Sequence, residues 1–169
     1  NDWLPVTTSI TATLYGIDML SPSDGWVVGS NSTVLHWNGS SWVNVPIKSG
    51  LNLHGVDMIS STDGWAVGYN SIDDVGVILH WDGITWSESA NPDTSIYLTD
   101  VAMVSTNDGW AVGNYYKIFR WDGSNWSVWD YSYPSNGFIH DIEMVSSTDG
   151  WAVGDFGLIM HWNGSSWTS

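Results

Sequence analysis

The feature that most constrains this chain is an internal repeat. Asp-Gly-Trp occurs four times, each time continuing as Val or Ala and then Val-Gly, at residues 24–26, 63–65, 108–110 and 149–151. A second block, His or Arg followed by Trp, Asn or Asp, and Gly, follows in every unit at residues 36–39, 80–83, 120–123 and 161–164. A further Trp stands three residues after each of these glycines, at Trp42, Trp86, Trp126 and Trp167. Units of this kind bury their apolar surface only by stacking on one another.

Each unit predicts four short strands. In the second strand of unit two, Gly64, Ala66 and Gly68 alternate with Trp65 and Val67, so one face of the sheet is small and the other bulky. Copies of such a sheet can stack with the bulky face of one against the small face of the next. The Asn-Gly and Asp-Gly pairs predict hairpins into the fourth strand. The chain is therefore predicted to be all-β, a β-propeller built from four four-stranded blades.

The repeat divides the single domain without a linker. Unit two carries an insertion at 70–75, which is expected to lie in a turn because the apolar segments keep their lengths. The predicted parts are a displaced outer strand at 1–12 and blades at 13–52, 53–97, 98–138 and 139–169, the last incomplete.

The N-terminal segment has the spacing of a fourth strand. Trp3 precedes Leu14 by the same distance as Trp42 precedes Leu53, so Trp3, Leu4 and Val6 are expected to form an assembly strand. In cis this strand closes a four-bladed ring, which is the more ordinary alternative. In trans it completes a blade of a neighbouring chain, and that contact produces a larger ring or a filament.

The Gly-Trp-Ala-Val-Gly segments and the Gly-x-x-Trp hairpins resemble the degenerate Asp-box repeats of sialidase-like propellers. They look closest to the photosystem II assembly-factor type, and the resemblance implies a propeller with protein partners. Trp occupies the position of the Asp in the Asp-box, so we expect the turn to be kept without the usual Asp hydrogen bonds. Sialidases hold a substrate carboxylate with three arginines, whereas this chain has one, Arg120. Together with the absence of hydrolase and phosphate-loop motifs, this predicts that the chain is not an enzyme.

Charge excludes further functions. Three basic residues stand against eighteen acidic ones, for a net charge of −15, which argues against nucleic-acid binding and against anionic membranes. The chain has no cysteine and no apolar run long enough to cross a membrane. It starts at Asn1 without Met or a signal segment, as a processed or excised product does. A surface rich in Ser, Thr, Asn and Gly favours an extracellular or cell-surface location.

Aromatic residues offer one candidate binding surface. Of the fourteen Trp, only Trp129 falls outside the repeat positions and the N-terminal strand. It forms an alternating stripe with Tyr131 and Tyr133. Packing is the preferred interpretation, because Trp129 aligns with Val45. The alternative is that the stripe contacts a protein or a glycan.

Three acids share one repeat position, Asp18, Asp57 and Glu143, and they are expected to line the central channel with Asp100 and Asp141 nearby. They can hold a cation such as Ca²⁺, although contact with loops or channel water is preferred. Asp73 and Asp74 in the insertion are a second candidate Ca²⁺ site, and no other cofactor is indicated. A shared position of His36, His80, His161 and Arg120 predicts a structural hydrogen bond in each blade.

Four Asn-x-Ser/Thr sequons are expected to be exposed and open to glycosylation: Asn31, Asn38, Asn125 and Asn163. Taken together, the sequence predicts a non-catalytic extracellular interaction or assembly module that associates with itself or with other proteins. The first alternative is a lectin-like propeller, and the second is an assembly-factor-like protein binder.

Overall fold

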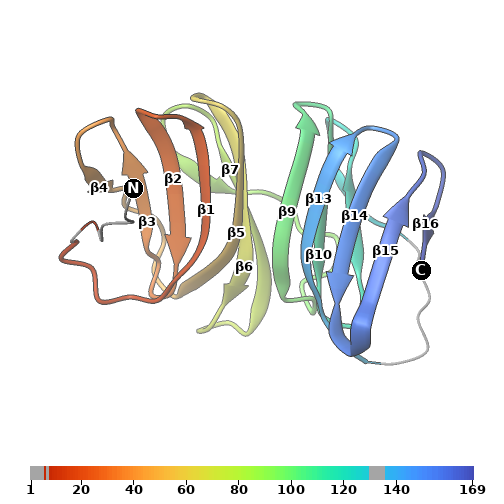
Figure 1. Cartoon of the computed structure of the whole chain (residues 1–169). Coiled ribbons are helices and arrows are strands. Elements are labelled where there is room, and N and C mark those ends of the chain that lie inside the picture. Colours follow the sequence, from red (N-terminus) through yellow and green to blue (C-terminus); the bar gives the residue numbers. More distant parts are fainter. Residues whose placement is uncertain (1–5, 7, 130–135) are drawn as a thin grey trace.

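The computed structural model describes residues 6, 8–129 and 136–169, and they form four antiparallel sheets of four strands each. In every sheet the strands lie in chain order, as the blade pattern predicts (Figure 1). Blade 1 holds β1 (Leu14–Ser21), β2 (Asp24–Gly29), β3 (Val34–Trp37) and β4 (Trp42–Asn44). Blade 2 holds β5 (Leu51–Ser60), β6 (Asp63–Asn70), β7 (Val75–Trp81) and β8 (Trp86–Glu88). Blade 3 holds β9 (Leu98–Ser105), β10 (Asp108–Gly113), β11 (Ile118–Trp121) and β12 (Trp126–Trp129). Blade 4 holds β13 (Ile139–Ser146), β14 (Asp149–Gly154), β15 (Leu158–Trp162) and β16 (Trp167–Thr168).

Helix is confined, in the described part of the chain, to one 3-10 turn at Asp155–Gly157 between β14 and β15. None of the helical structure in those residues is long and apolar enough to cross a membrane.

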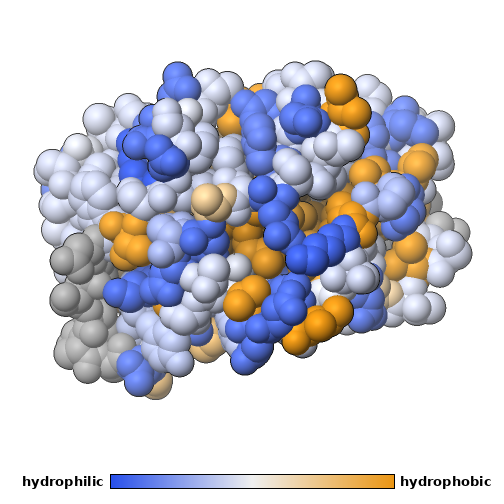
Figure 2. All heavy atoms as spheres, turned by 180° about the vertical axis from the view of Figure 1, so that it is seen from behind, coloured by the Kyte–Doolittle hydropathy of each residue, from blue (hydrophilic) through white to orange (hydrophobic). Residues whose placement is uncertain are grey.

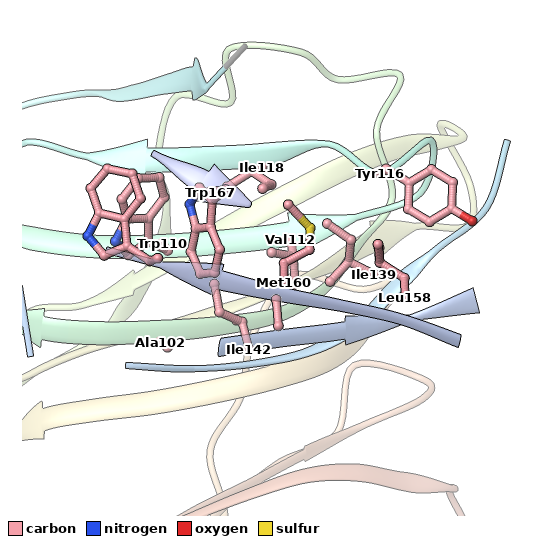
Figure 3. Packing of buried hydrophobic residues seen from close by; sticks show 12 residues of the cluster. Ala102, Trp110, Val112, Tyr116, Ile118, Ile139, Ile142, Leu158, Met160 and Trp167 are labelled. Atoms are coloured by element: carbon pink, nitrogen blue, oxygen red, sulfur yellow. The ribbon is translucent and has the colours of Figure 1, made fainter. Parts of the chain in front are cut away.

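The four blades stack in series through their first strands. β1 packs against β5, β5 against β9, and β9 against β13. Each sheet places its bulky face, here called the Trp face, against the small face of the next, here called the Gly face. Between blades 3 and 4, for example, Trp110 and Val112 pack against Met160 (Figure 3). Ala152 belongs to the same buried cluster. The predicted nesting of bulky and small faces is confirmed at all three junctions.

Glycine on the small face is required by how closely the first two strands of a blade approach. A Cβ atom on Gly64 would lie 2.3 Å from the sulfur of Met58, and one on Gly68 would lie 2.0 Å from the carbonyl oxygen of Asn52. Both distances are far inside van der Waals contact, and the second neighbour is backbone that cannot move aside. The Gly-x-x-x-Gly spacing of the repeat therefore records a steric limit of the fold.

The stack is an open arc. Blade 1 and blade 4 lie at opposite ends of it (Figure 1), and β13 does not pack on β1 as the other first strands pack on one another. Ile17 on β1 is 64% exposed and Trp151 on β14 is 48% exposed, although their counterparts inside the stack are buried. The described residues thus do not form the closed four-bladed ring that was the more ordinary expectation. On the side opposite to the view of Figure 1, apolar and hydrophilic residues are interspersed (Figure 2).

The hairpin between the third and fourth strands differs from the expectation in one respect. The turn does keep side-chain hydrogen bonds, because the residue after the Trp supplies them. The Oδ1 atom of Asp82 accepts hydrogen bonds from the N–H groups of Ile84 and Thr85 at 2.9 and 2.8 Å. Gly83, which lies between Asp82 and Ile84, has φ +89°, a conformation that favours glycine. The equivalent side chains of Asn38, Asp122 and Asn163 make the same pair of bonds.

Candidate partner-binding face

The shared His and Arg position is structural, as predicted. His80 Nε2 lies 2.9 Å from Asp63 Oδ1, and the His80 ring packs on Trp65 with ring centroids 4.4 Å apart. In blade 3 the guanidinium of Arg120 binds Asp108 and lies 4.4 Å from the Trp110 ring centroid. Each Asp-Gly-Trp motif therefore supplies both the carboxylate and the aromatic ring that hold this residue. The other two blades repeat the arrangement with His36 and His161.

A row of aromatic rings runs across the end of the molecule at which the first strands β1, β5 and β9 begin. Tyr15 stacks on His54 with centroids 4.6 Å apart, His54 meets Tyr69 edge-on at 5.7 Å, and Tyr69 stacks on Tyr97 at 5.0 Å. The Tyr97 hydroxyl donates a hydrogen bond to Asp74. Tyr15 is half exposed, and partial burial lowers the pKa of His54, so the ring stays neutral at pH 7. These residues, called the aromatic row below, offer stacking surface drawn from three blades.

Next to the aromatic row, the axis of the arc is hollow. A cavity of about 450 Å³ is lined by Tyr15, His54, Asp100, His140 and Asp141 among others. A second hollow of about 310 Å³ lies further along the axis and shares Ile17, Val56, Asp100 and Asp141 with the first. Its carboxylates are the three predicted to line the channel, Asp18, Asp57 and Glu143, and the two predicted to lie nearby, Asp100 and Asp141. The structure therefore brings these acids together around one space, here called the acidic hollow.

Two acids at the shared repeat position connect neighbouring blades. Asp18 Oδ2 accepts a hydrogen bond from the N–H of Met58 at 2.8 Å, and Asp57 Oδ2 accepts one from Met103 at 2.5 Å. In each case the carboxylate belongs to one blade and the amide to the next. The shared acid position thus satisfies a backbone donor at the blade junction.

Blade 3 has Ala102 at the shared position and makes this connection differently. Asp100 Oδ2 accepts a hydrogen bond from the N–H of Ile142 in blade 4 at 2.9 Å. Sequence alignment missed this role, because units one and two have Gly16 and Gly55 at the position of Asp100. The sequence did carry a signal for this role. Unit three has Ala102 in place of an acid, so the backbone N–H at this junction needs another acceptor.

Burial changes the protonation of two carboxyl groups in the acidic hollow. Burial raises the pKa of Asp57 to about 6; the charges of Asp18 and Glu143 add to the increase, and the hydrogen bond from Met103 opposes it. Burial also raises the pKa of Asp100 to about 8, with a further increase from its hydrogen bond with Asp141 and an opposing effect from the N–H of Ile142. At pH 7 Asp100 is therefore largely neutral, and a cation entering the hollow would favour its ionised form.

The candidate metal sites are not assembled as ligand sets. Among the residues that the structure describes, no group of three or more His, Cys, Asp or Glu could hold a metal ion. In the insertion, Asp73 accepts a hydrogen bond from Asn70 Nδ2 at 2.7 Å, and Asp74 accepts one from Tyr97. These two acids hold the β6–β7 turn against the aromatic row.

Trp129, the described member of the predicted stripe, is partly buried against the core between blades 3 and 4. Its ring meets Trp110 and Trp162 edge-on, both at a centroid distance of 5.3 Å. Tyr131 and Tyr133 lie outside the described residues, so glycan binding through the stripe stays a prediction. Trp3 and Leu4 of the predicted assembly strand also lie outside them, and Val6 is exposed. All four sequon residues are exposed, as expected: Asn31, Asn38, Asn125 and Asn163.

Comparison with solved structures agrees with this architecture. The structure described as YCF48 bound to D1 peptide aligns with all of the chain and 72% of its own length, at TM-score 0.64 and 18% identity. YCF48 from Cyanidioschyzon merolae aligns with 96% of the chain and 57% of its own length, at TM-score 0.73 and 19% identity. The chain has the fold of YCF48. The expected likeness to photosystem II assembly-factor propellers is confirmed at the level of the fold.

A third solved structure has a similar fold. The structure described as U3-55K aligns with 95% of the chain and 52% of its own length, at TM-score 0.71 and 10% identity. The chain thus spans between about half and three quarters of the three structures. No family model and no curated protein sequence matches the chain.

Proposed function

We propose that this chain is a non-catalytic, protein-binding propeller, similar in role to an assembly factor, and that it acts outside the cell. The acidic hollow bordered by the aromatic row is the observation that carries the proposal. A solved propeller of the same fold, YCF48, has a D1 peptide bound, which supports a protein partner for this chain as well. The partner segment we propose is a basic peptide with aromatic side chains.

Charge and shape both favour such a segment. Five carboxylates line the hollow, and the chain as a whole carries −15, so a Lys or Arg side chain is attracted over a long range. The half-exposed Tyr15 offers a ring face to a cation or to an aromatic side chain. A cation in the hollow also favours ionisation of Asp100, so binding at pH 7 should release a proton.

The test is calorimetry with a short synthetic peptide that alternates Lys and Tyr, measured in two buffers of different ionisation enthalpy. We expect binding with net proton release at pH 7, a loss of affinity of about tenfold in Tyr15→Ala, and a smaller proton release in Asp100→Asn. Ile84→Ala, at the hairpin tip on the opposite end of blade 2, is the matched control and should bind normally. Equal binding of a peptide with Glu in place of Lys would contradict the proposal.

A structural subunit that associates with itself is the second candidate, and the exposed end faces of the arc favour it. The sequence predicts association through the strand at 1–12. Deleting those residues should then leave monomers, and unchanged assemblies after the deletion would argue against that route.

A further inference from the structure

The contact between successive blades is made three times with the same geometry. Trp26 of blade 1 meets Trp81 and Trp86 of blade 2 at centroid distances of 4.8 and 5.5 Å. The Trp65 contacts with blade 3 measure 4.7 and 5.3 Å, and the Trp110 contacts with blade 4 measure 4.8 and 5.5 Å. The first ring of every junction is at most 3% exposed. One interface design is therefore used throughout the stack.

Blade 4 ends with an uncovered Trp face. Trp151 stacks on His161 at 4.3 Å and 26°, as Trp26 does on His36 at 4.4 Å and 25°, so the ring already has the orientation of a junction ring. It is nevertheless 48% exposed. Beside it Val153 is 42% and Ile159 59% exposed, whereas their counterparts in blade 3, Val112 and Ile118, are fully buried.

Blade 1 carries the complementary half of the same interface, a Gly face that is exposed along β1 but buried at Val27 and Leu35. Trp37 and Trp42 lie 5.5 Å apart at 46°, close to the 5.6 Å and 40° of Trp81 and Trp86, which receive Trp26. Ile17 and Met19 are 64% and 44% exposed. In blade 2 the corresponding Val56 and Met58 are 7% and 5% exposed, because blade 1 covers them.

The hydrogen bond between a carboxylate of one blade and a backbone N–H of the next has a corresponding residue at each end of the stack as well. Asp18 and Asp57 bind the N–H of a Met in the next blade, and Glu143 stands at their position in blade 4. Glu143 is exposed, and Met19 in blade 1 is the counterpart of Met58 and Met103. Glu143 and Met19 thus stand, at the two ends of the chain, at the positions that form this hydrogen bond between blades 1 and 2 and between blades 2 and 3.

We infer that a second copy of this chain covers both ends, with the Trp face of blade 4 docked on the Gly face of blade 1 of the other copy. The contact is heterologous, so each copy offers one half at either end. Two copies joined twice in this way give a closed ring of eight blades, within the range of known propellers. The inference deepens the self-associating candidate and differs from it in the contact, since it needs no strand exchange.

The N-terminal segment competes with this contact. Val6, Thr8 and Ile10 lie over Leu35 and Trp37 of blade 1, with a cavity of about 330 Å³ among these residues. Leu35 is only 2% exposed, so this part of the Gly face is already covered and the segment has to move aside for docking. Deleting residues 1–12 is expected to preserve or strengthen face docking, whereas it abolishes strand exchange, so the two routes give opposite results.

Sedimentation velocity of the 18.6 kDa chain over a range of concentrations tests the inference. We expect a species of twice the monomer mass, formed more tightly at high salt because both copies are strongly acidic. Trp151→Glu on the Trp face and Met19→Glu on the Gly face should each raise the dissociation constant at least tenfold. Ile84→Glu, an exposed aliphatic position on blade 2, should leave it unchanged.

Mixing the two variants provides the decisive measurement. Trp151→Glu keeps an intact Gly face and Met19→Glu keeps an intact Trp face, so the mixture should form a dimer under conditions where each variant alone is monomeric. This result also shows that both variants are folded. The inference is overturned by a wild-type chain that stays monomeric up to about 100 µM, by assemblies that Trp151→Glu leaves intact, or by a mixture that contains monomers only.

Discussion

At the scale of single residues, the repeat uses charged side chains for backbone satisfaction more than for ligand chemistry. Asp63 orients His80 through a hydrogen bond, and Asp82 stabilises a turn by accepting hydrogen bonds from its N–H groups. Asp57 accepts a hydrogen bond from a backbone N–H of the next blade. These roles explain how a chain with so few cations accommodates many acids, because N–H donors take the place of cationic partners. Asp100 also accepts a backbone hydrogen bond, from Ile142, but burial keeps it largely neutral at pH 7.

The protonation of Asp100 makes stability depend on pH. Its pKa is about 8 in the folded protein and near 3.8 in the unfolded chain, so the folded state binds the extra proton between these values. The free energy of unfolding should therefore fall as the pH rises from about 4 to about 8, and Asp57, with a pKa of about 6, adds to the fall up to that pH. His54, whose pKa is lowered, acts in the opposite direction below about pH 6.5.

Urea unfolding at several pH values measures this dependence. Asp100→Asn should flatten the profile and raise the free energy of unfolding at pH 8 by on the order of 1–2 kcal/mol, while Asn still accepts the hydrogen bond from Ile142. Asp122→Asn is the control, because hydrogen bonds from Asn125 and Ser124 lower the pKa of Asp122, and Asn occupies the same turn position in blades 1 and 4. A profile for Asp100→Asn with the slope of the wild type would contradict the assignment.

At the scale of elements, the strand pattern was predictable because it is dictated by local sterics. Gly64, Ala66 and Gly68 must face a close neighbour, and the observed β6 places them on the Gly face as expected. The exposed state of Trp151 was not predictable, because its motif is identical to that of the buried Trp110 and only the missing neighbour distinguishes them. The aromatic row also escaped prediction, since Tyr15, Tyr69 and Tyr97 occupy unrelated positions of the repeat and meet only through blade stacking.

This difference between identical motifs can be measured by a pair of substitutions. Trp65→Ala removes a ring that is 3% exposed and packed on two Trp of blade 3, so it should destabilise the chain by about 3–5 kcal/mol. Trp151→Ala, in the same sequence motif, should change the free energy of unfolding by less than about 1 kcal/mol at concentrations where the chain is monomeric. Denaturant unfolding at low protein concentration provides both values, and equal losses would mean that blade 4 has a covering partner within the chain.

At the scale of the whole molecule, the described blades form a linear array in which each end blade packs on a single neighbouring blade. Blades 2 and 3 have neighbours on both sides, whereas blades 1 and 4 have one each. In arrays of this kind stability is the sum of unit and junction contributions, so the end units open more easily than the central ones. Covering the ends with a second copy would give every blade two neighbours.

Hydrogen exchange measured at two protein concentrations connects this gradient to assembly. In dilute solution, amides of β2 and β14 should exchange at least tenfold faster than those of β6 and β10, because each end blade is held by a single junction. At high concentration the docked faces should protect β1, β2, β14 and β15, while the central blades change little, since association stabilises only what it covers. Trp151→Glu should keep the dilute pattern at every concentration. Protection that rises with concentration in all four blades alike would contradict docking through the end faces, and a flat pattern in dilute solution would contradict the open arc itself.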